Sequence, residues 1–174
     1  ELHNISREDQ DRFAAWSQSK ATRARSEGAF AEEIVPVSIS RRKQDDLLFT
    51  EDEFIKPTST IEVLSRLRPA FRKDGGSVTA GNSSGLNDGA CALLLANQRG
   101  IEQHELSPIA EIISSAVVGV EPRIMGIGPV EASKKALSKA GLALQDMDHI
   151  ELNEAFAAQS LACTRSLGLS DDDT

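Results

Sequence analysis

The chain has 174 residues, enough for one ordinary domain or for parts of two. Apolar residues make up 40% of it and charged residues 26%, the balance of a globular protein rather than of a disordered chain. With 19 basic and 27 acidic residues the formal net charge is −8, which opposes general binding to nucleic acid or to an anionic membrane. The longest apolar run, residues 90–96, is too short to cross a bilayer. We therefore expect neither nucleic acid nor a membrane as a partner.

The cysteines and histidines predict neither a disulfide framework nor a metal site. Cys91 and Cys163 are the only cysteines, and their separation does not match paired zinc ligands. His3, His104 and His149 are scattered, without the spacing of ligands on one helix face. Both cysteines lie in apolar stretches, where burial raises the pKa of a thiol, so we interpret them as inert core residues. This composition fits a reducing compartment, and we expect a cytoplasmic protein.

The first predicted element is a helix. Ser6 is a suitable N-cap, Asp9 three residues later completes an acidic form of the capping box, and Gly28 provides a left-handed stop. Residues 34–39 then predict a strand, placed at a sheet edge because it contains a proline. Residues 40–57 are highly charged, and we expect them to form an exposed loop.

The middle of the chain predicts a short helix and a buried strand. Apolar side chains recur every three residues over residues 60–67, and Pro69 limits the helix that they predict. Residues 80–89 are rich in glycine, asparagine and serine and lead directly into the apolar run 90–96. We expect residues 90–96 to form a buried strand.

From residue 108 onward the pattern alternates between strand and helix. Residues 109–120 are rich in β-branched side chains, residues 126–129 open a helix with a proline near its first turn, and Gly141 ends that helix. Residues 149–152 predict a short strand that runs into a second helix, which stops at Gly168. Strand, helix, strand and helix in this order predict a parallel strand pair with a right-handed crossover. The predicted class is α/β.

Two features could bind anions, and each has a simpler interpretation. The Gly-Ile-Gly-Pro turn at 126–129 lacks the third glycine of a dinucleotide fingerprint, so helix initiation explains it. A run of four cations without an acid could bind a polyanionic small molecule, or could be a solvated helix end. Its members are Arg66, Arg68, Arg72 and Lys73.

Asn153 lies where a predicted parallel strand ends and a helix begins. Ligands bind at this carboxyl edge in open α/β sheets, where a neutral amide could orient a water molecule or an oxyanion. The alternative is that Asn153 is an N-cap. From the residue alone, both interpretations stay open.

Three segments in a fixed order carry a family resemblance. They are residues 66–71 (RLRPAF), 78–90 (VTAGNSSGLNDGA) and 153–159 (NEAFAAQ), with MGIGP at 125–129 before the last. With these motifs the chain resembles the thiolases, the acetyl-CoA acetyltransferases and 3-ketoacyl-CoA thiolases. The resemblance covers essentially the whole chain. It implies an incomplete thiolase-like α/β fold of layered mixed sheets and helices.

The resemblance also implies that the chain is an internal fragment of a longer thiolase. Residues 1–85 correspond to the latter part of the loop domain, residues 86–107 to the last strand and helix of the first half, and residues 108–174 to the start of the second half. Thiolases work through an acyl-cysteine intermediate, with one cysteine in the first half, a Gly-His-Pro histidine and a Cys-x-Gly-x-Gly cysteine. None of these motifs occurs in this sequence. We therefore expect the chain by itself to be inactive.

By similarity, the residues that carry over are those for binding coenzyme A (CoA). Ser84 would hydrogen-bond the pantetheine arm and Ala80 would line its channel. Ala70 and Phe71 would pack along the arm, and Leu64 would lie near the adenine. No metal or separate cofactor is implied, because CoA and acetyl-CoA are substrates.

The remaining positions implied by the resemblance surround the nucleotide and the reacting atoms. Lys56 replaces an arginine that relatives place toward the nucleotide, which loses planar stacking. Asn153 would hold the water of an oxyanion hole, Ala155 and Phe156 would border the catalytic cavity, and Met125 would form the floor of the acyl pocket.

The expected function is part of an acyltransferase that condenses or cleaves acyl-CoA thioesters. A non-catalytic acyl-CoA-binding or lipid-carrier protein of the same fold is the alternative, and retention of Asn153 favours the enzyme. A structural α/β module without a ligand would leave the ordered motifs unexplained. The resemblance implies that the parent protein is a homodimer or homotetramer with acyl-CoA and CoA as its small-molecule partners.

Overall fold

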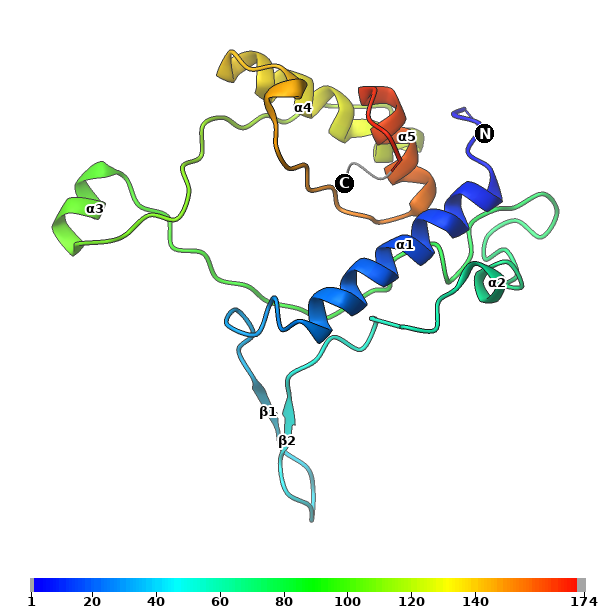
Figure 1. The fold of residues 1–174 in the computed structure, drawn as a ribbon, viewed down its shortest axis with the longest axis horizontal. Helices are drawn as coiled ribbons and strands as arrows, with labels where there is room; N and C mark the ends of the chain where they lie inside the picture. The colour runs from blue at the N-terminus through cyan, green and yellow to red at the C-terminus, as the bar shows by residue number, and fades with distance from the viewer. Residues whose placement is uncertain (1, 172–174) are drawn as a thin grey trace. The chain divides into compact units, whose positions relative to one another are not determined.

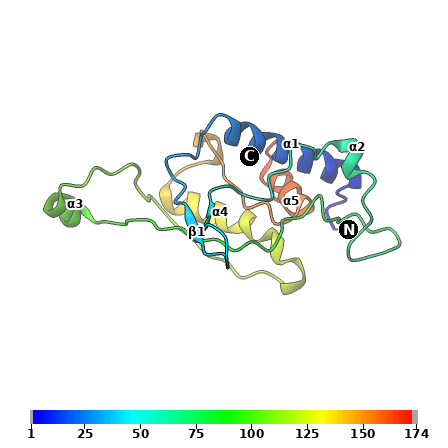
Figure 2. The same cartoon turned by 90° about the horizontal axis from the view of Figure 1, so that it is seen from below.

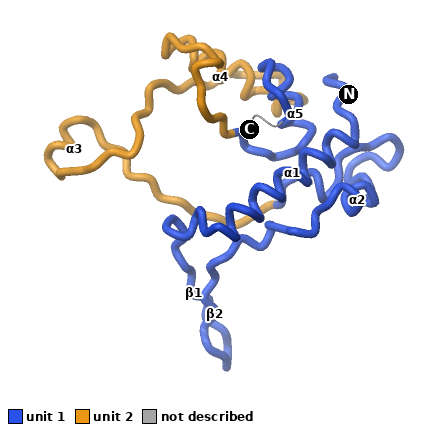
Figure 3. The backbone as a smooth tube through the Cα atoms, viewed as in Figure 1, with its two compact units in different colours: residues 1–85, 152–173 blue, residues 86–151, 174 orange. Residues whose placement is uncertain are grey.

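The computed structural model describes residues 2–171, which fall into two compact units (Figure 1). Of the described residues, 2–85 and 152–171 belong to the first unit, and residues 86–151 form the second (Figure 3). The C-terminal helix therefore belongs to the same unit as the N-terminal helix. This pairing joins segments that are far apart in the sequence.

The first unit begins with helix α1, Arg7–Ser26, as the sequence predicts. The Ser6 hydroxyl accepts a hydrogen bond from the Asp9 backbone N–H at 2.9 Å, and Gly28 follows the helix with a φ of +70°. The first turn carries acidic residues and the last turn basic ones, which complements the helix dipole. The start and the stop of α1 are local features, and the sequence predicts both correctly.

A small antiparallel hairpin follows α1. Strand β1, Val37–Ile39, pairs with strand β2, Leu47–Phe49, in a register that places Ser38 opposite Leu48. The strand predicted at 34–39 forms only at its end, and the prediction of a loop throughout 40–57 is wrong because β2 lies within it. The sequence did not predict β2 because its three apolar residues, which have a high strand propensity, are flanked by charged residues on both sides.

Helix α2, Ile61–Leu64, is shorter than the predicted 60–67. The Thr60 hydroxyl caps it by accepting from the Val63 N–H at 3.4 Å. Gly81 packs directly on the end of α2: a β-carbon at this glycine would collide with the side chains of Leu64 and Leu67. The glycine-rich loop can therefore lie closely against α2.

The core of the first unit lies between α1 and helix α5, Ala157–Leu167, and α2 packs on α1 as well (Figure 1, Figure 2). Helix α5 ends at Gly168, with a φ of +78°, at the predicted place. The Phe13 and Trp16 rings are 5.9 Å apart and tilted, which fits a favourable aromatic pair. The buried apolar cluster and the residues packed on it are Phe13, Ala157, Leu161, Ile5 and Trp16.

The second unit contains two α-helices and two 3-10 helices: α3 Gln98–His104, η1 Pro122–Ile127, α4 Gly128–Ala140 and η2 Leu144–Asp146. Helix α4 begins and ends as predicted, with Gly141 in the left-handed conformation. The segment before η1 runs along α4, because Lys135 and Lys139 donate to the carbonyls of Val117 and Ser115 at 3.1 and 2.9 Å.

Three predicted strands do not form. Residues 90–96, 109–120 and 149–152 have no regular strand pairing, and within residues 2–171 the hairpin β1–β2 is the only sheet. The predicted parallel pair is therefore wrong for this structure. Residues 90–96 are also exposed rather than buried; Leu93, for example, is 84% exposed. A strand needs a neighbour for its N–H and C=O groups, and these segments have none among the described residues.

Candidate functional site

The site begins where the glycine-rich loop meets the segment before α5. Ser83 and Phe156 form an isolated antiparallel bridge, and the Ser84 backbone N–H donates to the Ala155 carbonyl at 3.0 Å. The Ala157 N–H donates to the Asn82 carbonyl at the same distance, 3.0 Å. Ser84, Ala155 and Phe156, predicted as site residues from distant parts of the sequence, therefore lie together.

An aromatic pair extends this contact. The Phe71 and Phe156 rings meet edge to face at 6.5 Å, and both side chains stay exposed. Next to Phe71, the Ala70 N–H donates to the Val78 carbonyl at 2.8 Å, which brings residue 70 alongside the start of the loop. Ala70 and Phe71 thus belong to the same surface as Ser84 and Phe156.

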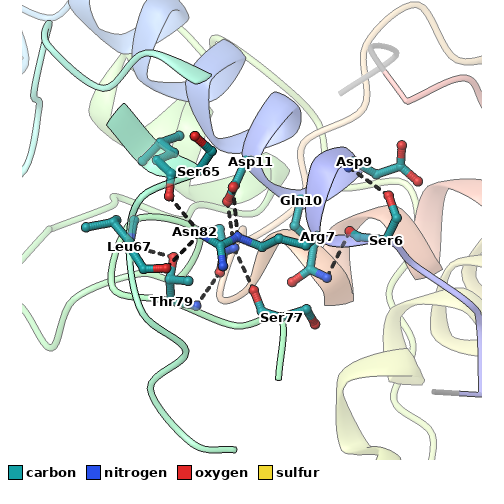
Figure 4. Close-up of polar contacts among 12 residues, drawn as sticks. Ser6, Arg7, Asp9, Gln10, Asp11, Ser65, Leu67, Ser77, Thr79 and Asn82 are labelled. Atoms are coloured by element: carbon teal, nitrogen blue, oxygen red, sulfur yellow. Dashed lines mark hydrogen bonds and ion pairs between the residues drawn. The ribbon is translucent and has the colours of Figure 1, made fainter. Parts of the chain in front are cut away.

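The loop itself is held by buried polar groups. Asn82 is 2% exposed; its Oδ1 accepts from the Thr79 N–H at 2.7 Å, and its Nδ2 donates to the Ser77 carbonyl at 3.0 Å (Figure 4). The Ser83 hydroxyl donates to the Thr79 carbonyl at 2.7 Å. These bonds leave Ala80 and Ser84 exposed at the surface of an ordered loop.

Asn153 is exposed, and the segment that carries it is tied to α1. The Ser17 hydroxyl donates to the carboxylate of Glu154, and the Lys20 ammonium lies 3.8 Å from the other oxygen of that carboxylate. Lys20 also lies over the Trp16 ring, 3.6 Å from its centroid. The N-cap of α5 is Phe156, so the interpretation of Asn153 as an N-cap is wrong.

The other predicted site residues have different surroundings. Lys56 is exposed, with its ammonium 5.5 Å from the centroid of the Phe54 ring. Leu64 is buried beneath the glycine-rich loop, where it supports Gly81. Met125 belongs to the second unit, where it is exposed in η1.

The two cysteines differ in environment. Cys163 is 0% exposed in α5, and burial raises the pKa of its thiol while a hydrogen bond from Gln159 works in the opposite direction. The burial of Cys163 confirms its predicted place in the core. Cys91 is exposed in the segment that lacks strand partners, so its predicted burial is wrong.

Charged residues on the rim of the site are exposed as well. Arg66, Arg68, Arg72 and Lys73 all lie in the stretch between α2 and the glycine-rich loop, on either side of Ala70 and Phe71. Among residues 2–171, no cluster of three or more histidine, cysteine, aspartate or glutamate side chains is arranged to hold a metal ion. None of the helices in this range has the length and hydropathy that crossing a bilayer requires.

Sequence reasoning missed the residues that hold the loop from below. Asp11 is buried on α1, and a polar residue on the inner face of a helix usually has a specific partner. Its place two residues before the buried Phe13 does not by itself indicate burial, because the exposed Arg12 lies between them. Its partner Asn82, in the middle of a glycine-rich loop, could not be identified without the fold.

Comparison with known proteins gives the family. Residues 1–99 match the model of the thiolase N-terminal domain, and residues 106–174 match that of the thiolase C-terminal domain. The chain is 52% identical over 173 residues to a beta-ketoadipyl-CoA thiolase of Acinetobacter baylyi, covering 99% of this chain and 43% of the relative. It is 52% identical over 170 residues to an acetyl-CoA acetyltransferase of Chromobacterium violaceum, covering 98% of this chain and 43% of the relative.

Solved structures show the same relation. The acetyl-CoA acetyltransferase of Bacillus anthracis matches with a TM-score of 0.94 at 45% identity, covering 99% of this chain and 43% of that chain. Human mitochondrial 3-ketoacyl-CoA thiolase matches with a TM-score of 0.92 at 45% identity and the same two coverages, 99% and 43%. The structure is therefore a partial thiolase fold that spans less than half the length of these relatives. Because both domain models match it in order, the chain belongs to the thiolase family.

Proposed function

We propose that this chain is part of an acyl-CoA acyltransferase that condenses and cleaves 3-ketoacyl-CoA through an acyl-cysteine intermediate. The observation that carries the proposal is the junction of Ser84 with Ala155, because it joins the glycine-rich loop to the segment of Asn153. The relatives named above are beta-ketoadipyl-CoA and acetyl-CoA enzymes. Acyl-CoA and CoA are accordingly the proposed partners, with no separate cofactor.

The proposed role of the first unit is to bind the CoA arm. The exposed Ser84 hydroxyl would hydrogen-bond an amide of the pantetheine, next to Ala80. Phe71 and Phe156 present exposed aromatic edges against which the apolar part of the arm would pack, with Ala70 beside them. The exposed cations around Phe71 would attract the phosphates of CoA to an otherwise acidic protein.

The proposed substrate-binding residues also include Lys56, Leu64 and Met125. Lys56 would approach the nucleotide as a point charge, without the planar stacking of an arginine. Leu64 would act near the adenine through the surface that it supports, since its own side chain is buried. Met125 would form the floor of the acyl pocket.

In the proposed reaction a cysteine thiolate attacks the thioester carbonyl carbon. A carbon–sulfur bond to the enzyme forms, the bond to CoA breaks, and the CoA thiolate takes up a proton. In the condensation, the thiolate of the Cys-x-Gly-x-Gly cysteine takes an α-proton from a second acyl-CoA. The resulting enolate attacks the acyl-enzyme carbonyl carbon and releases the first cysteine as a thiolate. The amide of Asn153 would orient a water molecule that donates to the enolate oxygen.

The residues of this chain favour binding over nucleophilic chemistry. Cys163 is buried with a raised pKa, Cys91 lies in an irregular segment, and the sequence contains neither a Gly-His-Pro nor a Cys-x-Gly-x-Gly motif. We therefore propose that the nucleophile belongs to other parts of a complete thiolase and that the 174-residue chain does not turn over. We also propose that the parts of the thiolase fold in this chain divide at residues 85 and 107. The proposed location is the cytoplasm, and the proposed parent protein is a homodimer or homotetramer.

A segment exchange tests the proposal. In the Acinetobacter baylyi relative, the aligned segment is replaced by this chain, and thiolysis of acetoacetyl-CoA is measured for the chimera and for the chain alone. We expect turnover by the chimera and none by the chain. A chimera that folds and binds CoA without turnover would support the carrier alternative instead. The Ser84→Ala chimera serves as a site control and should show a raised KM for CoA.

A further inference from the structure

Helix α1 carries a charge pair on its buried side. The Arg7 Nε lies 2.7 Å from Oδ2 of Asp11, one helical turn later, and Asp11 is 2% exposed. A carboxylate that is buried this deeply destabilises the fold unless charged or polar groups surround it. Both members of the pair also bond groups outside α1.

The second oxygen of Asp11 reaches the glycine-rich loop. Its Oδ1 accepts from Asn82 Nδ2 at 3.0 Å (Figure 4). The same Nδ2 donates to the Ser77 carbonyl, and Oδ1 of Asn82 accepts from the Thr79 N–H. The backbone carbonyl of Asn82 accepts from the Ala157 N–H at the start of α5. Asn82 thus connects α1, the loop and α5, and Asp11 holds its side-chain amide in place.

The guanidinium of Arg7 reaches a second segment. Its Nη2 donates to the carbonyls of Leu64 and Leu67, at 2.7 and 3.0 Å. Leu64 is the last residue of α2, and Leu67 lies in the turn that follows, where its N–H also donates to the Leu64 carbonyl at 3.0 Å. Arg7 therefore fixes the end of α2 while Asp11 fixes the loop that packs on it.

We propose that Asp11 and Arg7 are positioning residues for CoA binding, which act through Asn82 and the end of α2. This inference rests on the proposed function for its ligand. Ser84 lies two residues beyond Asn82, in a loop without secondary structure of its own, so the place of its hydroxyl depends on how Asn82 is held. Loss of the Asp11 charge would release the loop and leave the rest of α1 in place.

Hydrogen exchange in the 174-residue chain tests the contact independently of any activity. In Asp11→Asn we expect the Thr79, Ser84 and Ala157 amides to exchange about tenfold faster, the loss typical of a hydrogen bond to a charged group. Amides in the middle of α1 should keep their protection. Glu8→Gln removes an exposed 3.0 Å ion pair with Arg12 on the same helix and should change nothing. Unchanged exchange at Thr79 and Ser84 in Asp11→Asn would overturn the proposal.

Steady-state kinetics of the chimera described above test the effect on binding. Asp11→Asn should raise KM for an acyl-CoA about tenfold and change kcat by less than about twofold, since only uniform binding is lost. The same rise is expected with an acyl-pantetheine that lacks the nucleotide, because the loop faces the arm. Adding Asp11→Asn to Asn82→Ala should raise KM no further, because Asn82→Ala has already removed the contact through which Asp11 acts. Glu8→Gln should leave both constants unchanged.

Arg7→Lys is the milder variant, for the case that Asp11→Asn prevents folding. A lysine keeps the charge but cannot bind both carbonyls and the carboxylate, so KM should rise by less than in Asp11→Asn. A fall in kcat with an unchanged KM would instead indicate a loss of folded enzyme and would contradict a positioning role. If the unmodified chimera does not turn over, the proposed function fails, and the exchange experiment still decides whether Asp11 orders the loop.

Discussion

At the scale of single residues, a substitution of Asn153 tests whether this residue contributes to the rate constant kcat or to the affinity for CoA. Its side chain is exposed beside Glu154, which Ser17 and Lys20 tie to α1. In the chimera, Asn153→Ala should lower kcat by about 10²–10³-fold, as expected when one donor of an oxyanion site is lost, with little change in CoA affinity. Kinetics with acetoacetyl-CoA measure both. A weaker affinity with a normal kcat would place Asn153 outside the oxyanion site.

The two thiols should differ strongly in reactivity. Cys163 is completely buried and burial raises the pKa of its thiol, whereas Cys91 is exposed. Because the thiolate is the reactive form, brief treatment of the folded chain with iodoacetamide should modify Cys91 and spare Cys163. Mass spectrometry of the peptides distinguishes the two, with the urea-unfolded chain as control. Turnover of acetoacetyl-CoA that disappears in Cys91→Ser would contradict the assignment of Cys91 as non-catalytic.

Arg165 links stability to acidic pH. A hydrogen bond from Arg165 lowers the pKa of Asp171; for Asp9, burial works to raise the pKa, but hydrogen bonds from Arg165 and Ser6 leave it lowered. Groups with a lowered pKa stabilise the fold above their unfolded-state pKa, about 3.9, and lose that contribution as the pH falls through the folded-state value. The pairs are partly exposed, so the contribution is at most about 1 kcal/mol.

The test is urea unfolding of the chain over a pH series. Arg165→Gln should reduce stability near neutral pH and flatten the loss of stability at acidic pH. Arg165→Lys keeps the charge and should retain part of the effect. A variant Arg165→Gln with the same acid dependence as the original chain would contradict this account.

At the scale of elements, helix α1 organises the first unit. It packs on α2 and α5 and holds the glycine-rich loop through Asp11. Ser6→Ala removes the cap of α1 and should lower the free energy of unfolding by about 1 kcal/mol. Chemical denaturation followed by circular dichroism measures the change. Ser6→Thr keeps a capping hydroxyl and should recover most of the stability; equal losses in both variants would exclude the cap as the cause.

Sequence patterns predict the ends of several helices but not the pairing of strands. The start of α1 at Ser6, the stop of α4 at Gly141 and the stop of α5 at Gly168 follow from local cap chemistry and are predicted correctly. Residues 90–96 and 109–120 have the composition of strands but do not form them, because a strand depends on a neighbouring strand. Composition cannot supply that neighbour.

At the scale of the whole molecule, the chain exposes apolar surface that its relatives' additional length would be expected to cover. The exposed side chains of residues 90–96 and 109–120 include Leu93, Leu94, Leu95, Ile109, Ile112 and Val117. Exposed apolar patches of this kind bind hydrophobic dyes and promote association. The chain should therefore enhance ANS fluorescence strongly, and Leu94→Ser should reduce the enhancement. A chain that gives no more fluorescence than the chimera would show that these segments are covered.

Sequence alone determined the start of α1, the ends of α4 and α5 and the family, because these signals lie in consecutive residues. It also placed Ser84, Ala155 and Phe156 in one predicted site by resemblance. Only the tertiary structure showed that the loop and the segment before α5 hydrogen-bond each other, that Asp11 on α1 bonds Asn82 of the loop, and that Arg7 bonds the end of α2. These contacts join residues separated by 57 to 71 positions along the chain, and their distances and burial are set by packing rather than by local sequence.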